Sequence, residues 1–337
     1  MLSGQTFNPM EQSQLVTVLI PMKNGTLYIK SCLNSLKRQT YENLEILIVN
    51  DHSTDDSTNI IRSSRDKRII LLHSPSQGIV PALNYGLSKS KGKYIARLDT
   101  DDLALPSRIE EQVNYLETHP HVGVIGSWVR GFGSQKGIFR YPASSKNIKC
   151  ELLFSSPFAH PSVLLRKSVL TKNKVRYDSS YPHVEDYAFW FKLQKYTDFY
   201  NLPKVLTLHR FHHAQVGEIY HPAQSRARYR LQHDILRDLS ISHPDMDAHS
   251  ILSDSSVKIS SQQLHAITEW INLLIKANKS SKKYGQIAMQ ISLGRRYLEM
   301  IFKLPKINIL QKIQLLSRPY ILIAVVDILI KKISNLL

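Results

Sequence analysis

The first hundred residues alternate short apolar runs with segments that have the spacing of amphipathic helices. Each apolar run is rich in β-branched residues and short enough to be a strand that is buried on both faces. Strands that alternate with helices at such short intervals are typical of an α/β fold, a parallel sheet covered by helices on both sides. The predicted strands are residues 15–20, 44–51, 68–73 and 93–99, and the predicted helices include 26–39 and 81–92.

Polar side chains stand where three of these strands end. Ligands of parallel α/β sheets bind beyond the carboxyl ends of the strands, so these side chains predict a shared ligand site. They are Lys23 and Asn24 after the first strand, Asp51 at the end of the second, and the acids of the segment 99–102 after the fourth.

The segment Leu98–Asp102, LDTDD, contains three acids that follow a strand directly. Crowded carboxylates repel one another unless a cation or hydrogen-bond donors compensate, and a hard divalent ion with oxygen ligands is the usual compensator. A solvated loop that caps a helix beginning at 103–106 is the commoner explanation of an isolated Asp-x-Asp. Asp51 favours a ligand site over a capping loop, because it follows another strand of the same sheet and would face the same crevice. Its carboxylate could accept a bond from a base or ribose. Together these acids predict a nucleotide-diphosphate site.

Two common nucleotide-binding classes are disfavoured by the motifs that the chain lacks. It contains neither a G-x-G-x-x-G nor a G-x-x-x-x-G-K-[ST] segment. The first motif would indicate a dinucleotide enzyme and the second a P-loop NTPase.

The alternation ends near residue 120, which predicts a different arrangement for the second half. Residues 121–142 resemble a hairpin, and residues 160–170 a strand that leads into a helix. Residues 184–196 have helical spacing, and three further helices are predicted between 224 and 304.

The chain carries 44 Lys and Arg against 27 Asp and Glu, a net charge of +17. Such a charge favours a polyanionic partner. The basic residues of the tail, 305–337, alternate with Ile and Leu rather than with the aromatic rings that stack on bases. We therefore expect an anionic membrane surface and no nucleic acid as a partner, with the tail as a basic amphipathic anchor in the plane of the membrane. The alternative is a tail that packs on the catalytic domain.

The cysteines and the apolar runs bear on location. Cys32 and Cys150 are the only cysteines, which excludes a disulfide scaffold and a multi-cysteine zinc site and favours a reducing compartment. No apolar run approaches the ~18 residues of a membrane span, and the first 15 residues lack the features of a secretory signal. We expect a cytoplasmic protein, peripheral at the inner face of the cytoplasmic membrane.

Five separated segments resemble family 2 glycosyltransferases in order and spacing, over about residues 14–216. They are VTVLIPMKN, ILIVNDHSTDDS, the stretch from QGIVPALNYG to SRIEEQV, HPSVLLRKSVL and VEDYAFWFKL. The resemblance implies the GT-A fold, a Rossmann-like nucleotide-diphospho-sugar transferase fold, here with a C-terminal helical extension. It implies a catalytic domain over 14–222, with a nucleotide-binding half to about 105 and an acceptor half from 106. A helical region over 223–304 and the tail complete the predicted domains.

The resemblance also implies roles for residues of the donor site. Pro21 and Asn24 match the loop that borders the base, and Asp51 matches the acid that binds uracil. Arg97 matches an arginine that lies along the nucleotide. The first acid of the family's D-x-D serves the ribose and the next holds the metal, which implies these roles for Asp99 and Asp101.

The resemblance places the chemistry on the acidic pair at 185–186. It implies that Asp186 is the general base of an inverting transfer, with Glu185 beside it as an orienting or acceptor-binding group. Such a transfer needs one carboxylate to take the proton of the attacking hydroxyl. A divalent ion, Mn²⁺ or Mg²⁺, neutralises the leaving diphosphate. His212 matches a histidine that completes the metal shell or contacts the diphosphate. The alternative for the acids is a favourable contact with the helix dipole, and both can hold together.

The expected activity is therefore transfer of one sugar from a nucleotide-sugar, expected to be UDP-linked, to a glycan or lipid-linked glycan. The expected pathway makes lipopolysaccharide, O-antigen or capsule. Two alternatives stay open. A processive polysaccharide synthase is disfavoured because the chain has no transmembrane run and no Q-x-x-R-W motif. A nonenzymatic module that binds nucleotide-sugar or membrane is disfavoured by the acids at 99–101 and 186.

Overall fold

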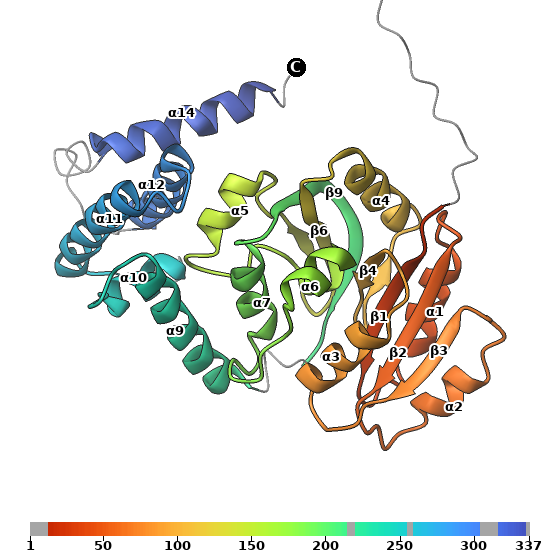
Figure 1. Cartoon of the computed structure of the whole chain (residues 1–337). Helices are drawn as coiled ribbons and strands as arrows, with labels where there is room; N and C mark the ends of the chain where they lie inside the picture. The colour runs from red at the N-terminus through yellow and green to blue at the C-terminus, as the bar shows by residue number, and fades with distance from the viewer. Residues whose placement is uncertain (1–12, 214–219, 255–258, 304–315, 335–337) are drawn as a thin grey trace, which may run out of the picture. The chain divides into compact units, whose positions relative to one another are not determined.

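The computed structural model describes residues 13–213, 220–254, 259–303 and 316–334 (Figure 1). Its chain forms two compact units whose segments interleave along the sequence. The first unit comprises Met1–Phe139, Ala159–Arg176 and Lys204–Phe211, and the second Arg140–Phe158, Tyr177–Pro203 and His212–Leu337. The predicted domain boundaries follow sequence order, whereas these units are defined by packing, so the boundaries stay a proposal.

The first unit is built on a mixed sheet in the order β3-β2-β1-β4-β8-β6-β9-β5, with β7 paired to β6. The β9 strand begins in the second unit. The pairs β1–β2, β2–β3 and β1–β4 are parallel, as the alternation predicts, whereas β8 runs antiparallel to β4. The strands are β1 (Val16–Met22), β2 (Leu44–Asn50), β3 (Ile69–His73), β4 (Tyr94–Arg97), β5 (Leu103–Ala104), β6 (Val122–Gly133), β7 (Gly137–Phe139), β8 (Leu164–Arg166) and β9 (Asp198–Phe211).

The helices of the first unit alternate with its strands along the chain, and two of them pack on the sheet. The α3 helix contacts β1 and β2, and α4 contacts β6 and β8. The predicted helix over 26–39 is confirmed as α1, and its buried side consists of Ile29, Cys32, Leu33 and Leu36 at helical spacing. The helices are α1 (Ile29–Lys37), α2 (Ser57–Arg62), α3 (Ile79–Lys89), α4 (Arg108–Thr118) and α6 (Lys167–Asn173), and a 3₁₀ turn covers His160–Ser162.

Two predicted boundaries in this unit are wrong. The first strand does not end before Pro21 but continues to Met22, with Pro21 buried inside it. The register with β4 stops at Leu19, so Pro21 lies where β1 pairs only with β2 and its missing N–H breaks no bond to β4. Gly92 does not close α3, which ends at Lys89. Gly92 is required because a Cβ there would lie 2.5 Å from the backbone nitrogen of Thr17.

The segment after the acids is also not a helix start. Leu103 and Ala104 form β5, which pairs antiparallel with β9 at Leu208 and Thr207. The helix begins only at Arg108. A two-residue strand paired with a strand about a hundred residues later has no local signature, so the sequence pattern could not reveal it.

The second unit is mainly helical. Its described residues between 221 and 303 form four helices, whereas three were predicted. The sequence did not reveal α10 because that helix is too short to show a periodic pattern. Its start is nevertheless well defined, since the Asp245 side chain accepts a bond from the Ala248 N–H at 2.9 Å. The helices are α5 (Ser145–Glu151), α7 (Glu185–Leu193), α9 (His221–Asp238), α10 (Met246–Ser253), α11 (Ser261–Ser281), α12 (Gln286–Lys303) and α14 (Pro319–Ser334).

The α14 helix packs on α12 with one side and exposes the other. Ile321 and Ala324 are fully buried, and a Cβ at Gly294 of α12 would lie 2.2 Å from the Tyr320 carbonyl oxygen. Asp327 forms an ion pair with Arg295 of α12. This side of α14 is therefore packed, as in the alternative to the expected anchor, although it packs on α12. The opposite side exposes apolar residues, Leu322, Val326, Leu329 and Ile330. Among the described residues, no helix is long and apolar enough to cross a membrane.

We expect acid to destabilise the second unit through His249. This histidine is buried in α10, with Nε2 2.8 Å from the Leu153 carbonyl oxygen and Nδ1 accepting a bond from the Trp270 indole. Burial lowers its pKa to about 4. The unfolded chain binds a proton near pH 6.5, so the free energy of unfolding should fall as pH drops from about 6.5 to 4, by about 3 kcal/mol in total.

Urea unfolding between about pH 7 and pH 4.5 measures this loss. His249→Gln is the control, because its amide can still donate to Leu153 but does not titrate. An equal pH dependence in both proteins would contradict the assignment to His249.

Candidate functional site

The loops after β1 and β2 are tied to each other by Asn24. Its side-chain oxygen accepts a bond from the Thr54 N–H at 2.9 Å, and its own N–H donates to the Ser53 hydroxyl at 2.9 Å. The backbone of Asn24 has a φ of 52°, a left-handed conformation that asparagine adopts more readily than most residues. Asn24 therefore shapes the edge of the sheet at which the two strands end.

Asp51 follows β2 directly and is buried. One carboxylate oxygen accepts a bond from the Gly78 N–H at 2.9 Å, just before α3. The backbone N–H of Asp51 donates to the Met22 carbonyl at 2.7 Å. Asp51 thus joins the ends of β1 and β2 to the start of α3, at the edge where the sequence predicts the ligand.

Asp99, Asp101 and Asp102 lie close together beyond β4. Each offers a carboxylate oxygen within 4.8 Å of the others. Arg97, at the end of β4, forms an ion pair with Asp99. The predicted crowding of acids is confirmed, and its oxygen donors suit a hard divalent cation.

Asp102 has a different environment from its two neighbours. It is 0% exposed, and its carboxylate accepts bonds from the Arg210 backbone N–H at 2.8 Å and from His209 Nδ1 at 2.9 Å. Burial raises the pKa of Asp102 to about 6, against the lowering effect of the His209 bond. Both of its oxygens hold the end of β9.

Arg210 fixes the backbone of the acidic loop. Its Nε donates to the Asp101 carbonyl at 3.0 Å. Its guanidinium lies 4.7 Å from the ring centre of Tyr28 and 4.3 Å from that of Phe132. Two aromatic rings hold this cation by cation–π attraction. Arg210 thus holds the backbone of Asp101 in place.

Arg108 is a buried arginine that bonds to the backbone beside the acidic loop. It is 1% exposed, and it donates to the Arg97 carbonyl at 2.7 Å and to the Val163 carbonyl at 3.3 Å. Burial lowers its pKa to about 9. Its Nε donates to the Gln112 side chain at 3.3 Å. The Arg108 guanidinium thus ties the end of β4 to the residue before β8.

Glu185 and Asp186 begin α7 in the second unit. Both lie in its first turn, where carboxylates meet the helix dipole favourably. Asp186 accepts a bond from the Ser156 hydroxyl at 3.1 Å. Burial and the nearby Asp186 carboxylate raise the pKa of Tyr141 to about 12. The Asp186 carboxylate therefore accepts a bond from the Ser156 hydroxyl and lies near Tyr141.

His212 directly follows β9 and lies in the second unit, half-buried. The group of acids at 99–102 is the only one among the described residues with three potential metal ligands close together, and it does not include this histidine. The metal role of His212 therefore stays a prediction. His209, three residues earlier, contacts the acidic loop through Asp102, and the sequence pattern could not distinguish it from its neighbours.

A family model described as glycosyl transferase family 2 matches residues 17–173. A protein from Haemophilus influenzae that is named a glycosyltransferase is 34% identical over 239 residues, 67% of this chain and 74% of that protein. The amylovoran biosynthesis glycosyltransferase AmsE of Erwinia amylovora is 33% identical over 187 residues, 53% of this chain and 68% of AmsE.

Solved structures show the same fold. TarS of Staphylococcus aureus, solved in complex with UDP-GlcNAc, is 16% identical with a TM-score of 0.57, over 86% of this chain and 88% of that one. The mannosyltransferase PcManGT of Pyrobaculum calidifontis, solved with GDP-Man and Mn²⁺, is 16% identical with a TM-score of 0.54, over 85% and 88%. At these identities the likeness concerns the fold, and the predicted GT-A fold is confirmed.

Proposed function

Because the chain belongs to the family 2 glycosyltransferases, we propose that it transfers one sugar from a nucleotide-sugar to a hydroxyl of a glycan or lipid-linked glycan, with inversion at the anomeric carbon. The acids at 99–102, grouped beyond the carboxyl end of β4, are the observation that carries the proposal. They suit a divalent cation and with it the diphosphate of such a donor. The ion is Mn²⁺ or Mg²⁺.

In this proposal the first unit binds the donor. Asn24 and Pro21 border the base, Asp51 accepts from it, and Arg97 lies along the nucleotide. Asp99 serves the ribose. Asp101 would hold the cation, together with His212, and the bound ion would neutralise charge on the leaving diphosphate.

Asp186 is the general base of the proposed reaction. It takes the proton of the acceptor hydroxyl while that oxygen bonds to the anomeric carbon. The bond from this carbon to the diphosphate oxygen breaks on the opposite face, which inverts the configuration. Glu185, beside it in the first turn of α7, orients the base or the acceptor.

A panel of nucleotide-sugars, read by release of the free nucleotide, tests the donor. TarS is seen with UDP-GlcNAc and PcManGT with GDP-Man, so fold neighbours include both bases. We propose a UDP-sugar because Asp51 matches the family's uracil-binding acid. Turnover with GDP-sugars alone would contradict this part of the proposal. The likeness to AmsE supports a surface-polysaccharide pathway, such as lipopolysaccharide, O-antigen or capsule.

Ser156→Ala should reduce turnover by a few-fold to tenfold, the effect of one hydrogen bond. The Ser156 hydroxyl donates to Asp186, and losing a donor raises the pKa of a carboxylate. We therefore expect the acidic limb of the pH–rate profile to move to higher pH, as measured by initial rates across the acidic range. Ser155→Ala is the control, because the Ser155 hydroxyl bonds to Glu151 instead. A profile that falls without shifting would contradict the role.

We also propose that the exposed apolar side of α14 attaches the protein to an anionic membrane, at the inner face of the cytoplasmic membrane. Replacing its exposed residues with Gln should lower the affinity for anionic vesicles ~1,000-fold, as measured by sedimentation, since each of the four replacements removes about 1 kcal/mol or more of apolar burial. Transfer to a soluble acceptor should persist. The residues are Leu322, Val326, Leu329 and Ile330.

Leu273→Gln on α11 is the control for this change, because that leucine is also exposed. Deleting the tail is a poorer test than these substitutions, since it would uncover the side of α12 that α14 covers. Unchanged vesicle binding in the α14 variant would contradict the membrane role. The basic residues 306 and 312 lie outside the described residues.

A further inference from the structure

A pocket lies between α3 and α6 in the first unit, with a volume of about 410 Å³. That volume is within the ~300–1,000 Å³ of small-molecule sites. Its lining comes from the second half of α3, from Ile95 near the start of β4 and from α6 and the residues after it. The acids at 99–102 follow the opposite end of β4. The pocket is thus separate in the fold from the proposed donor site.

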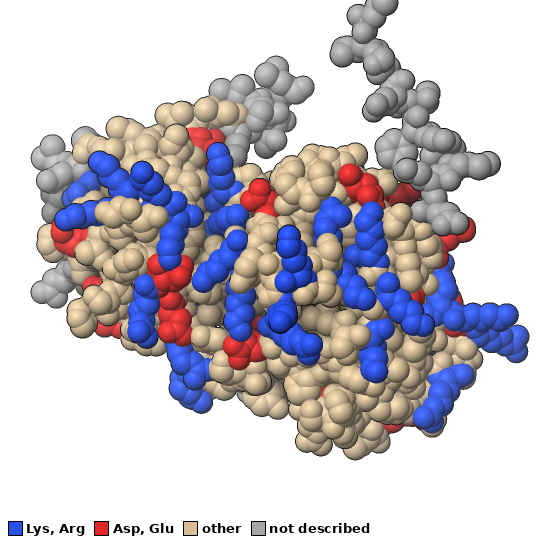
Figure 2. Space-filling model, in the orientation of Figure 1, with Lys and Arg blue, Asp and Glu red and all other residues tan. Residues whose placement is uncertain are grey.

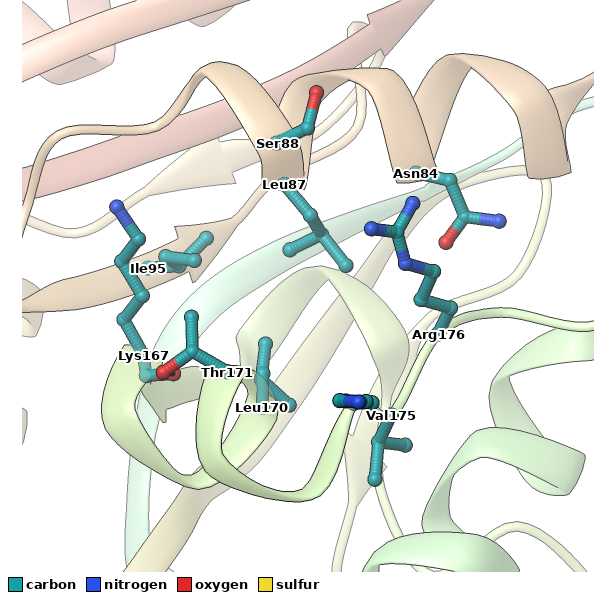
Figure 3. Close-up of a pocket in the computed structure, with 10 residues that line it drawn as sticks. Asn84, Leu87, Ser88, Ile95, Lys167, Leu170, Thr171, Val175 and Arg176 are labelled. Atoms are coloured by element: carbon teal, nitrogen blue, oxygen red, sulfur yellow. Dashed lines mark hydrogen bonds between the residues drawn. The ribbon is translucent and has the colours of Figure 1, made fainter.

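The walls of the pocket are basic and its floor is apolar. Figure 3 shows Leu87 pointing from α3 toward α6, opposite Leu170, with Lys167 on one side and the guanidinium of Arg176 near Asn84 on the other. Leu170, Val175 and Ile95 are buried. Lys174 and Arg176 are exposed at the rim.

The charge around the pocket is one-sided. Residues 79–91 and 167–176 contain six basic residues and no acidic residue. Figure 2 shows Lys and Arg side chains spread over much of the face that it presents. None of the six forms an ion pair with a carboxylate of the described chain. They are Lys89, Lys91, Lys167, Lys172, Lys174 and Arg176.

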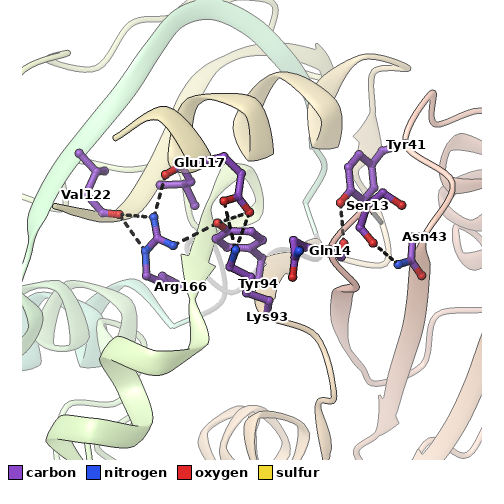
Figure 4. Close-up of polar contacts among 10 residues, drawn as sticks. Ser13, Gln14, Tyr41, Asn43, Lys93, Tyr94, Glu117, Val122 and Arg166 are labelled. Carbon is purple, nitrogen blue, oxygen red and sulfur yellow. Dashed lines mark hydrogen bonds and ion pairs between the residues drawn. The ribbon is translucent and has the colours of Figure 1, made fainter. Parts of the chain in front are cut away.

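Two basic residues next to the pocket, Lys93 and Arg166, have structural partners. Lys93 forms an ion pair with Glu117 at 2.8 Å, and Arg166 donates to the Tyr94 hydroxyl and the Leu116 carbonyl (Figure 4). The cations of the pocket have no such carboxylate. Helix dipoles can account for Lys172, in the last turn of α6, and a bond to the Ser90 carbonyl accounts for Lys167. Neither explanation applies to Arg176, which lies beyond that helix.

The lining also limits the chemistry of a ligand. It offers amino, guanidinium, hydroxyl and amide groups but neither an aromatic ring to stack on a base nor a carboxylate to accept from sugar hydroxyls. Cations at the rim suit a phosphate, and the apolar floor suits a hydrocarbon chain.

We propose that the α3–α6 pocket binds an anionic phospholipid, with the headgroup phosphate at Lys174 and Arg176 and an acyl chain on Leu87, Leu170 and Val175. This site is independent of the proposed transfer reaction and of the apolar side of α14. It would give the first unit its own contact with an anionic lipid.

Calorimetry of the full chain tests the proposal with dihexanoylphosphatidic acid, dihexanoylphosphatidylcholine and inorganic phosphate, with the lipids kept monomeric. The phosphatidic acid should bind most tightly. The double variant Lys174→Asn, Arg176→Gln should weaken it about tenfold or more, the scale of two cations near an anionic lipid. Asn tolerates the positive φ of position 174. Leu87→Gln should weaken phosphatidic acid and leave phosphate binding unchanged.

The double variant Lys30→Gln, Lys37→Gln is the control, because it removes two exposed charges from α1. It should bind the phosphatidic acid like the unchanged protein. Equal losses in both double variants would overturn the site in favour of general charge attraction. Phosphate binding as tight as lipid binding would overturn the lipid in favour of a plain anion, and absence of binding would overturn both. Donor turnover should be unchanged in the pocket variant, so failure here is distinguishable from failure of the transfer proposal.

Discussion

Asp186→Asn should lower sugar transfer by ~10²–10⁴-fold and leave donor binding nearly unchanged, because the amide keeps the shape of the side chain but cannot take a proton. Single-turnover transfer and calorimetric donor titration measure the two quantities. The variant should fold, since removing one acid from the first turn of α7 costs only ~0.3–1 kcal/mol.

Asp178→Asn is the matched control for this variant. Asp178 is a carboxylate of the same unit that contacts α7 through Lys192, at 2.6 Å, but has no assigned part in the reaction. Its replacement should cost stability and little turnover. If instead donor affinity collapses in Asp186→Asn while transfer persists, Asp186 belongs to the donor site and the base lies elsewhere.

The parallel part of the sheet could be predicted because its strands are buried on both faces. A continuous apolar run such as LEILIVN records this burial directly, and every residue of β2 is buried. The same pattern predicted the end of β2 to within one residue and that of β4 to within two, so Asp51 and Asp99 follow the strands and do not end them. What each of these side chains contacts could not be predicted, since Gly78 is 27 residues from Asp51 along the chain.

The distinction between Asp101 and Asp102 depends on contacts that no local pattern records. Adjacent acids look alike in sequence, yet Asp102 is buried because β9 supplies His209 and the Arg210 N–H from more than a hundred residues later. Because Asp102 and His209 are 107 residues apart in the sequence, nothing local distinguished His209 from the other histidines of TLHRFHH. The burial of Arg108 could not be predicted for a related reason, because the carbonyls that accept its bonds are brought to it by the fold.

Asp101→Ala should abolish metal-dependent donor binding and lower turnover by ~10²–10³-fold, since a bound cation supplies several kcal/mol of charge stabilisation. The fold should be maintained, because the Asp101 backbone carbonyl that accepts from Arg210 Nε is retained in the variant. Donor titrations with Mn²⁺, with Mg²⁺ and in excess chelator measure the first effect, and thermal unfolding measures the second. Full activity in excess chelator would contradict the metal role.

Asp102→Ala separates this role from that of the buried acid beside it. Removing the Asp102 carboxylate leaves the Arg210 N–H and His209 without their acceptor in a buried place, which costs about 1–3 kcal/mol for an unsatisfied group. We therefore expect Asp102→Ala to lower the unfolding temperature, whereas Asp101→Ala should not. If Asp101→Ala is the less stable of the two, the acid that supports β9 and the acid that binds the cation have been interchanged.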